Sequence, residues 1–293
     1  MQTQYHPERH GDAHASGPSL VLRDTQALDT WAARVRANRE QVERLRGVVR
    51  GPDFYAPIAQ RFRANPRRED EPALAVLRDL AQPDDVWLDI GAGAGRYALP
   101  LALVAREVIA LDASDKMVET LRLEIAGHGI GNVRSVQARW PDAPRLQCDV
   151  AMIAHVGYDV EAMGPFLDAM EVAAGRLCVA VLAARRPAWV YDELWPEVHG
   201  EARATLPALP EFLALQLARD RLFELRLVDS PPRSYESVEE ALTAARFQTW
   251  AQPGSDADRR LRAVVVRRLV ERDGRYAFNW DPSPLGIVTW QPR

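Results

Sequence analysis

The chain has 293 residues, of which 47% are hydrophobic and 27% charged, as in ordinary globular proteins that bury a sizeable core. A net charge of −4 gives no electrostatic basis for holding nucleic acid or an anionic membrane. The two cysteines, Cys148 and Cys178, lie in apolar runs, which excludes zinc ribbons and disulfide scaffolds. No run is long and apolar enough for a membrane span or a secretory signal, so we expect a cytoplasmic protein without a membrane partner.

The N-terminal part is expected to contain a tail and a helical cap. Residues 1–19 are polar and include proline and glycine, which predicts a disordered tail. Residues 20–71 are expected to form the cap, because apolar side chains recur at helical intervals between residues 27 and 49. A second short helix is expected at 53–63.

Residues 72–184 alternate between short apolar runs and amphipathic segments. Pro72 fits the first turn of a helix that runs to Leu80. The expected strands are residues 86–90, 108–111, 133–137, 149–154 and 177–182, and the expected helices between them are 96–106, 116–126 and 161–174. This alternation predicts an α/β fold with a doubly wound, mostly parallel sheet and right-handed crossovers.

Residues 185–293 are less regular. The segment 189–210, rich in aromatic residues and proline, is expected to be an insertion or lid on the substrate side. It is followed by an expected helix at 209–221, a strand at 223–228 and helices at 237–250 and 257–271. Two last strands, 276–280 and 286–290, are expected to complete the sheet.

A glycine-rich loop lies between the first strand and the next helix. It contains Gly91, Gly93 and Gly95, and glycines let the chain turn tightly and let a ligand touch the backbone. The helix start after the loop would offer free N–H groups to an anionic group. The third glycine comes one residue earlier than in the G-x-G-x-x-G pattern of dinucleotide-binding folds, which counts against a nicotinamide or flavin enzyme. A mere tight turn is the structural alternative.

An acidic residue closes the second expected strand. Asp112 follows Gly91 by 21 residues, and a carboxylate at this place can accept hydrogen bonds from both hydroxyls of a ribose. It could instead cap the helix that begins near Ser114, although Ser114 and Asp115 are better placed for that. We therefore expect a nucleoside-containing cofactor.

Together these segments resemble the class I S-adenosylmethionine-dependent methyltransferases, which have a Rossmann-like fold. Residues 88–97 match the first motif of that family, 109–114 the second and 148–155 the fourth-strand motif. The resemblance implies that S-adenosylmethionine is the cofactor. By position in these motifs, or in the segments beside them, the residues expected to bind it are Asp89, Gly91, Ala92, Gly93, Gly95, Asp112, Ala113, Met117, Arg139, Trp140 and Ala154, with Tyr55 from an aromatic helix that closes over the cofactor.

The end of the fourth strand bears on the acceptor. It lacks the Asn/Asp-Pro-Pro-aromatic signature of enzymes that methylate exocyclic base amines and the Pro-Cys of cytosine-C5 enzymes. A small-molecule acceptor is therefore expected, rather than nucleic acid. His155 is the candidate general base if the acceptor is a hydroxyl or a protonated amine, although it could equally only line the pocket. No metal is expected. The alternatives left open are an NAD(P)-dependent oxidoreductase and a non-catalytic cofactor-binding protein.

Overall fold

The structure is a computed structural model that describes residues 23–46, 59–60, 62–143, 145–186, 189–230, 233–280 and 283–293. The tail expected at 1–19 and Tyr55, with most of the helix expected at 53–63, lie outside these residues.

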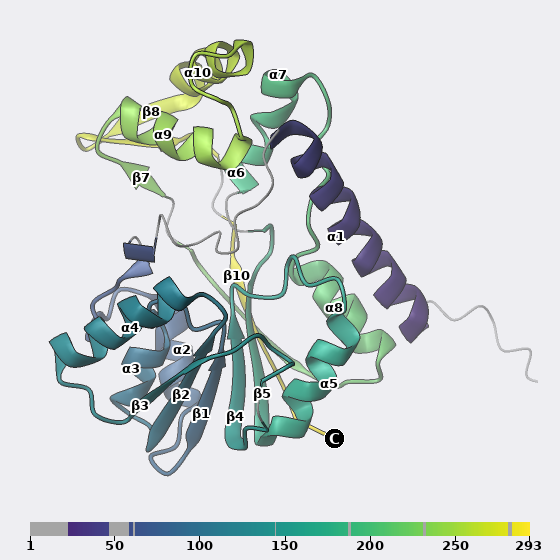
Figure 1. Ribbon diagram of the computed structural model, residues 1–293, viewed down its shortest axis with the longest axis vertical. Coiled ribbons are helices and arrows are strands. Elements are labelled where there is room, and N and C mark those ends of the chain that lie inside the picture. The colour runs from purple at the N-terminus through teal and green to yellow at the C-terminus, as the bar shows by residue number, and fades with distance from the viewer. Residues whose placement is uncertain are drawn as a thin grey trace, which may run out of the picture.

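In the described part of the chain, seven strands form the main sheet, in the order β3-β2-β1-β4-β5-β10-β6 (Figure 1). Their bounds are β1 (Val86–Ile90), β2 (Glu107–Asp112), β3 (Val133–Gln137), β4 (Cys148–Ala154), β5 (Ala174–Ala183), β6 (Glu224–Val228) and β10 (Leu285–Trp290). The pairs among β1 to β5 are parallel, and β10 is antiparallel to both β5 and β6. The prediction of a doubly wound, mostly parallel α/β sheet is confirmed.

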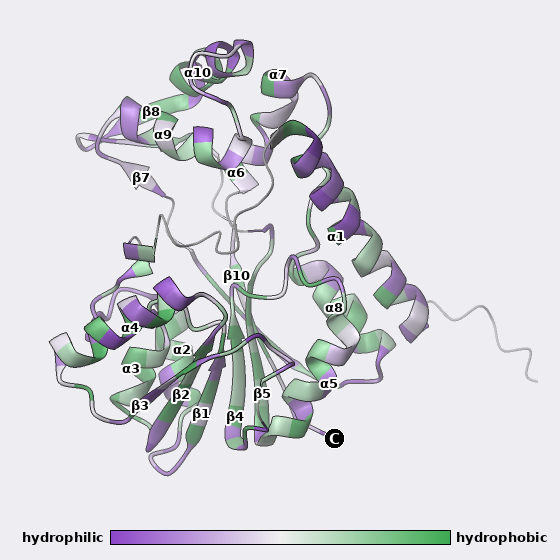
Figure 2. Ribbon diagram, in the orientation of Figure 1, coloured by the Kyte–Doolittle hydropathy of each residue, from purple (hydrophilic) through white to green (hydrophobic). Residues whose placement is uncertain are grey.

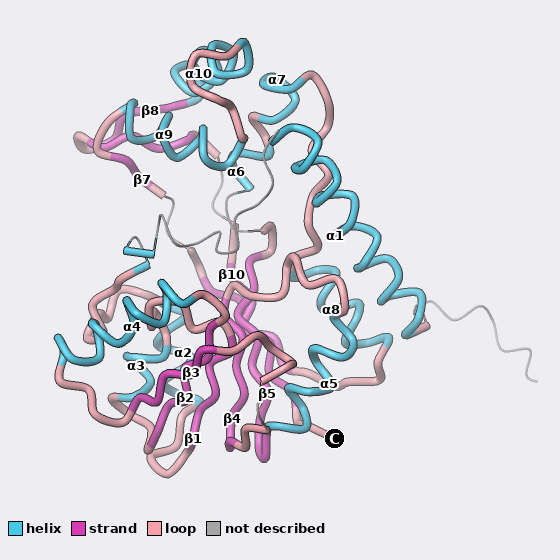
Figure 3. The backbone as a smooth tube through the Cα atoms, in the orientation of Figure 1, coloured by secondary structure: helices cyan, strands magenta, loops and turns pink. Residues whose placement is uncertain are grey.

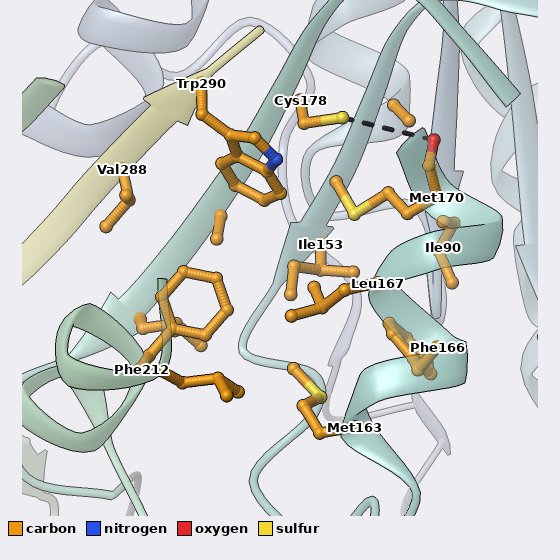
Figure 4. Close-up of a cluster of buried hydrophobic side chains, with 14 of the residues drawn as sticks. Ile90, Ile153, Met163, Phe166, Leu167, Met170, Cys178, Phe212, Val288 and Trp290 are labelled. Atoms are coloured by element: carbon orange, nitrogen blue, oxygen red, sulfur yellow. Dashed lines mark hydrogen bonds between the residues drawn. The ribbon is translucent and has the colours of Figure 1, made fainter. Parts of the chain in front are cut away.

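Helices cover both faces of this sheet. One face carries α2 (Pro72–Leu80), α3 (Ala98–Ala102) and α4 (Asp115–His128), and the other carries α5 (Met163–Ala173) and α8 (Leu209–Ala218). The central strands are buried on both faces, so they are apolar along nearly their whole length (Figure 2). On the α5 side, Phe166 and Leu167 pack with Ile153, Phe212 and Trp290 (Figure 4).

The long helix α1 (Asp24–Arg46) lies along α5 and α8 (Figure 1). The indole N–H of Trp31 donates a 2.8 Å hydrogen bond to the carbonyl of Val160. The side-chain amide of Gln41 donates to the carbonyl of Ala202 at 2.7 Å, and the guanidinium of Arg34 contacts Thr205. Helix α1 therefore holds the segment that leads into α8.

A second group of elements lies above the carboxyl ends of the parallel strands (Figure 3). This upper lobe contains α6 (Trp189–Asp192), α7 (Trp195–His199), β7 (Ser234–Tyr235), α9 (Val238–Thr249), α10 (Asp256–Arg268), β8 (Leu269–Arg272) and β9 (Arg275–Phe278). It has its own buried core, built around Tyr191, Leu242, Leu261 and Phe278. The lobe is assembled from two separate parts of the chain: α6 and α7 come between β5 and α8, and β7, α9, α10, β8 and β9 come between β6 and β10.

Two local expectations are corrected here. The helix expected at 257–271 ends at Arg268, and residues 269–272 form β8, which pairs with β9 across a turn at Asp273 and Gly274. Both turn residues have positive φ, of 52° and 72°, as the Asp-Gly hairpin turn requires. Both last strands were expected to complete the main sheet. Only β10 does so, whereas β9 belongs to the three-stranded sheet β7-β9-β8.

Candidate active site

A cavity of about 980 Å³ opens at the carboxyl ends of the parallel strands. Its floor is the loop after β1 with the ends of β2, β4 and β5, and its far wall belongs to the upper lobe. The strand order reverses between β1 and β4, because the chain passes from β1 to β2 and β3 on one side and to β4 and β5 on the other. Ligands of open α/β sheets bind at such a switch point.

The glycine loop is folded against the end of β2. The N–H groups of Gly91 and Ala92 both donate to the carbonyl of Leu111, at 2.7 and 2.9 Å. Gly91 has φ +78°, and a Cβ there would lie 2.5 Å from a methyl carbon of Val156. Gly93 has φ +56°, and a Cβ there would project beside the sulfur of Met117, at 3.8 Å. The loop thus needs glycine both for its shape and for the open cradle beside it.

The helix after the glycine loop was expected to offer free N–H groups to an anionic group, but the structure differs there. A helix was expected from Arg96, but α3 begins at Ala98 and has five residues. Pro100 lies inside it and offers no N–H, and the chain turns towards β2 from Leu103. The loop itself, rather than a helix N-terminus, therefore forms this edge of the cavity.

The carboxylate of Asp112 lies between the loop and α4 and lines the cavity. One oxygen accepts from the N–H of Gly93 at 2.8 Å, and the other accepts from the N–H of Ser114 at 2.9 Å. The hydroxyl of Ser114 accepts from Met117 N–H, so Ser114 is the cap of α4. A carboxylate only accepts hydrogen bonds, which is the chemistry that a ribose hydroxyl requires of its partner.

Asp89 is buried beneath the same loop and also lines the cavity. Burial raises the pKa of Asp89 to about 7, the negative charge of Asp112 adds to this rise, and the N–H of Ala98 opposes it. A cation that enters the cavity near Asp89 would favour the ionised carboxylate.

The remaining predicted cofactor residues divide into three groups. Ala92, Ala113, Met117, Arg139, Trp140 and Ala154 line the cavity together with Asp89, Gly91, Gly93, Asp112 and His155. The Trp140 indole is fixed by a 3.1 Å hydrogen bond from its N–H to the carbonyl of Phe166. Gly95 does not line the cavity; a Cβ there would lie 2.6 Å from Leu121 and 2.8 Å from Leu99, so it lets the loop pack on the helices behind it. Tyr55 lies outside the described residues.

His155 directly follows β4, with the uncommon backbone φ of +57°. Its side chain lines the cavity, and its Nδ1 is buried without a hydrogen-bond partner among the described residues. The pKa of His155 is lowered to about 4, chiefly by burial and also by the charge of Arg96, while Glu71 opposes this lowering. The imidazole is therefore neutral near physiological pH and is a weaker base than an exposed histidine.

A buried acidic group beside His155 escaped the sequence reasoning. Glu71 accepts hydrogen bonds from the Tyr97 hydroxyl at 2.5 Å, from Arg68 Nε at 2.7 Å and from Arg96 at 3.1 Å. Burial alone would raise the pKa of Glu71, but Arg96, Tyr97 and Arg68 together lower it. Glu71 is the last residue of the segment expected to form the helical cap, for which no buried carboxylate was expected. The sequence signal that could have indicated one is Arg96, directly after the glycine loop.

The upper wall of the cavity was also only partly foreseen. Trp189 and Tyr191 come from the segment expected to line an acceptor pocket. Arg233, Tyr235 and Trp280 come from the second stretch of the upper lobe, for which no role was inferred. Folding, not sequence proximity, brings the two stretches together.

The described residues contain no cluster of three or more potential metal ligands, and none of their helices is long and apolar enough to cross a membrane.

The order of the sheet, the glycine loop and the carboxylate at the end of β2 define an enzyme class that binds a nucleoside-containing cofactor. Comparison with known proteins narrows this class. The family described as "Methyltransferase domain" matches residues 88–171. The chain is 28% identical over 141 residues to a protein of Methanothermobacter thermautotrophicus named "Probable cobalt-precorrin-6B C(15)-methyltransferase (decarboxylating)", covering 46% of this chain and 67% of the relative.

Another relative is the 23S rRNA uracil-C(5)-methyltransferase RlmD of Pseudomonas putida, 35% identical over 121 residues. That match covers 41% of this chain, which spans only 25% of the relative. Among solved structures, the YcgJ protein of Bacillus subtilis has a TM-score of 0.54 at 16% identity, over 75% of this chain and 98% of that one. A SAM-dependent methyltransferase of Thiobacillus denitrificans, in complex with S-adenosyl-L-homocysteine, has a TM-score of 0.50 at 17% identity, over 84% and 100%. The structural matches show the fold.

Residues 88–171 match a methyltransferase domain, and the chain is similar in sequence and fold to S-adenosylmethionine-dependent methyltransferases. The residues present fit that cofactor, because the loop leaves a cradle that a Cβ on Gly93 would enter and the acceptor-only carboxylate of Asp112 lines the same cavity. The similarity to methyltransferases counts against the oxidoreductase alternative.

Proposed function

We propose that this methyltransferase acts on a small molecule, bound in the same cavity as the methyl donor. The observation that carries the proposal is the extent of the cavity. Its volume of about 980 Å³ lies at the upper end of the roughly 300–1,000 Å³ that is usual for ligand pockets. The cavity continues from Asp112 on the sheet to Arg233 and Trp280 on the upper lobe, which leaves room for an acceptor beyond the donor.

The donor is assigned to the half of the cavity that lies on the sheet. Asp112 would accept hydrogen bonds from the ribose, Asp89 would provide a negative charge, and Met117 and Trp140 would provide apolar surface for the adenine. When bound, S-adenosylmethionine supplies an electrophilic methyl group. The task of the chain is to hold the acceptor in line with that group, and such positioning is worth roughly 7–11 kcal/mol.

His155 is assigned to the acceptor. It lies between the two halves of the cavity, at the end of β4, and its imidazole is neutral with Nδ1 unpartnered. A neutral imidazole can accept a hydrogen bond from a hydroxyl or amine and take up the proton as methyl transfer proceeds. Because its pKa is low, His155 suits an acceptor whose proton is readily lost.

RNA methylation of the kind in the name of one relative is the competing possibility. Methylation at C5 of a pyrimidine requires a nucleophile to activate the ring, and a cysteine thiolate is the usual one. Neither cysteine of this chain lines the cavity, and both are buried. Burial raises the pKa of Cys148 to about 12, and Cys178 lies under α5 with its sulfur 4.0 Å from the carbonyl of Met170 (Figure 4). These observations favour the small-molecule acceptor.

The test is transfer of a labelled methyl group from S-adenosylmethionine to a low-molecular-mass cell extract and, separately, to total RNA. We expect labelled products in the low-mass fraction, and none with an Asp112→Ala variant. Label in RNA that depends on Asp112, with none in the small molecules, would refute the proposal.

A further inference from the structure

The upper wall of the cavity is a continuous row of aromatic rings. Phe278 contacts Tyr191 and Tyr235 edge-on, with ring centroids 6.0 and 6.1 Å apart. It stacks on Trp280 at 5.3 Å with an interplanar angle of 16°, and Trp280 contacts Trp189 at 5.8 Å. All five rings line the cavity.

The two ends of this row differ in exposure. Tyr191, Tyr235 and Phe278 are buried in the core of the upper lobe, whereas Trp189 and Trp280 are only partly buried. The buried rings fix the wall, and the two indoles present open aromatic surface to the cavity. A planar ring packs well on such a surface.

The buried end of the row has more hydrogen-bond donors than acceptors. The hydroxyls of Tyr191 and Tyr235 lie 2.5 Å apart, so one donates to the other. Arg233 is exposed at the cavity wall and interacts electrostatically with both tyrosines. Because one tyrosine hydroxyl donates to the other, the second O–H is left without an acceptor among the described residues.

The charge of Arg233 is also uncompensated in the described part of the chain. No ion pair joins Arg233 to a carboxylate of the described residues, although Asp229 also lines the cavity. The neighbouring Arg186, by contrast, is paired with Asp192. A guanidinium with free N–H groups and no counter-charge, beside a tyrosine pair with a free O–H, is a receptor for an anion.

We propose that the methyl acceptor is a planar aromatic acid. Its ring lies against Trp189 and Trp280, and its carboxylate is bound by Arg233 with the Tyr191–Tyr235 pair. Because Arg233 and the tyrosines belong to the upper lobe and His155 to the end of β4, the carboxylate anchors the molecule and the methylated atom lies at its other end. This inference rests on the proposed function and names the chemical class of its substrate.

The test is binding of matched acid and amide pairs to the protein saturated with S-adenosylhomocysteine. The probes are 3,4-dihydroxybenzoate with its amide, indole-3-acetate with indole-3-acetamide, and 2-naphthoate with 2-naphthamide. Calorimetry gives the affinities, and quenching of tryptophan fluorescence reports contact with the indoles. We expect at least one acid to bind about ten- to a hundredfold more tightly than its amide, as expected for hydrogen bonds to a charged group.

Three variants show which residues are responsible for the preference. Arg233→Gln should remove the preference for the acid, and Arg226→Gln, on the exposed face of β6, should leave it intact. Trp280→Leu should weaken the binding of the acid and of its amide by the same factor. An absent preference across all three pairs, or a preference that survives Arg233→Gln, would overturn the inference.

Binding of S-adenosylhomocysteine distinguishes a failure of the substrate assignment from a failure of the proposed function. If it binds and no acid is preferred, the assignment of the substrate class fails and the proposed function stands. If it does not bind, the proposed function itself fails.

Discussion

The Asp112 carboxylate accepts a 2.8 Å hydrogen bond from the backbone N–H of Gly93. This bond joins the end of β2 to the loop after β1, so the carboxylate assigned to the ribose also fixes the shape of the loop. The same negative charge contributes to the raised pKa of Asp89 beneath the loop. The parts of the donor site are therefore coupled, and a change at Asp112 reaches all of them.

The Asp112→Asn variant should bind S-adenosylhomocysteine about ten- to a hundredfold more weakly, because an amide has one acceptor oxygen where the carboxylate has two. The measurement is the rise in melting temperature with ligand concentration. Asp115→Asn is the matched control, since Asp115 is exposed in the first turn of α4, and its ligand response should equal that of the wild type. Equal responses of all three proteins would contradict the role of Asp112.

The raised pKa of Asp89 should make the stability of the protein depend on pH. With a pKa of about 7 in the folded protein, it holds its proton more tightly there than in the unfolded chain. Asp89 therefore stabilises the fold most at pH values below its pKa in the unfolded chain. This stabilisation falls by about 1.4 kcal/mol per pH unit as the pH rises from about 4 to about 7.

The opposite dependence comes from His155, whose lowered pKa makes stability rise with pH from about 4 to about 6.5. The two effects partly cancel in the wild type, so the test is a difference. The free energy of unfolding of Asp89→Asn minus that of the wild type, from urea titrations, should increase with pH between about 5 and about 7. A difference that is constant over this range would show that the pKa of Asp89 is not raised.

The His155→Asn variant should lower kcat by about 10²- to 10⁴-fold if the imidazole takes up the acceptor's proton. Asparagine tolerates the positive φ of this position, so the fold should be kept. The control is His128→Asn at the end of α4, which should retain wild-type kcat. The wild-type rate should be independent of His155 protonation at neutral pH, because its pKa is about 4. A change in kcat of only a few-fold would mean that His155 just lines the pocket.

Glu71→Gln should lower the free energy of unfolding by about 1–3 kcal/mol, since the buried carboxylate accepts hydrogen bonds from Arg68, Arg96 and Tyr97. Urea denaturation provides the measurement. Glu69→Gln, two residues away and exposed, is the control and should change stability by less than about 0.5 kcal/mol. Similar losses in both variants would show that the cluster around Glu71 is not specifically stabilising.

The sheet could be predicted from the sequence because its central strands are buried on both faces. Residues 86–90 form the buried central strand β1 with the predicted bounds, and residues 133–137 form the less buried edge strand β3, also with the predicted bounds. The cap Ser114 and the glycine loop mark the neighbouring turns. Local sequence determines these features, since apolar runs, caps and turn residues act within a few positions. The order of the strands then brings Asp89, Asp112 and His155 to one edge.

The upper half of the cavity could not be predicted in this way. Trp189 and Trp280 are far apart in the sequence and meet only because two insertions pack into one lobe. Glu71 lies in a run of charged residues that is typical of a solvated turn, and its burial depends on the arginines of another segment. The low pKa of His155 likewise arises from burial and from Arg96. Tertiary contacts determine the meeting of the two indoles, the burial of Glu71 and the pKa of His155.

Calorimetric titration of the wild-type protein with S-adenosylhomocysteine, with NAD⁺ in parallel, shows which cofactor the cavity binds. We expect one molecule of S-adenosylhomocysteine bound per chain and no heat of binding with NAD⁺. Binding of NAD⁺, with no binding of S-adenosylhomocysteine at millimolar concentration, would contradict it.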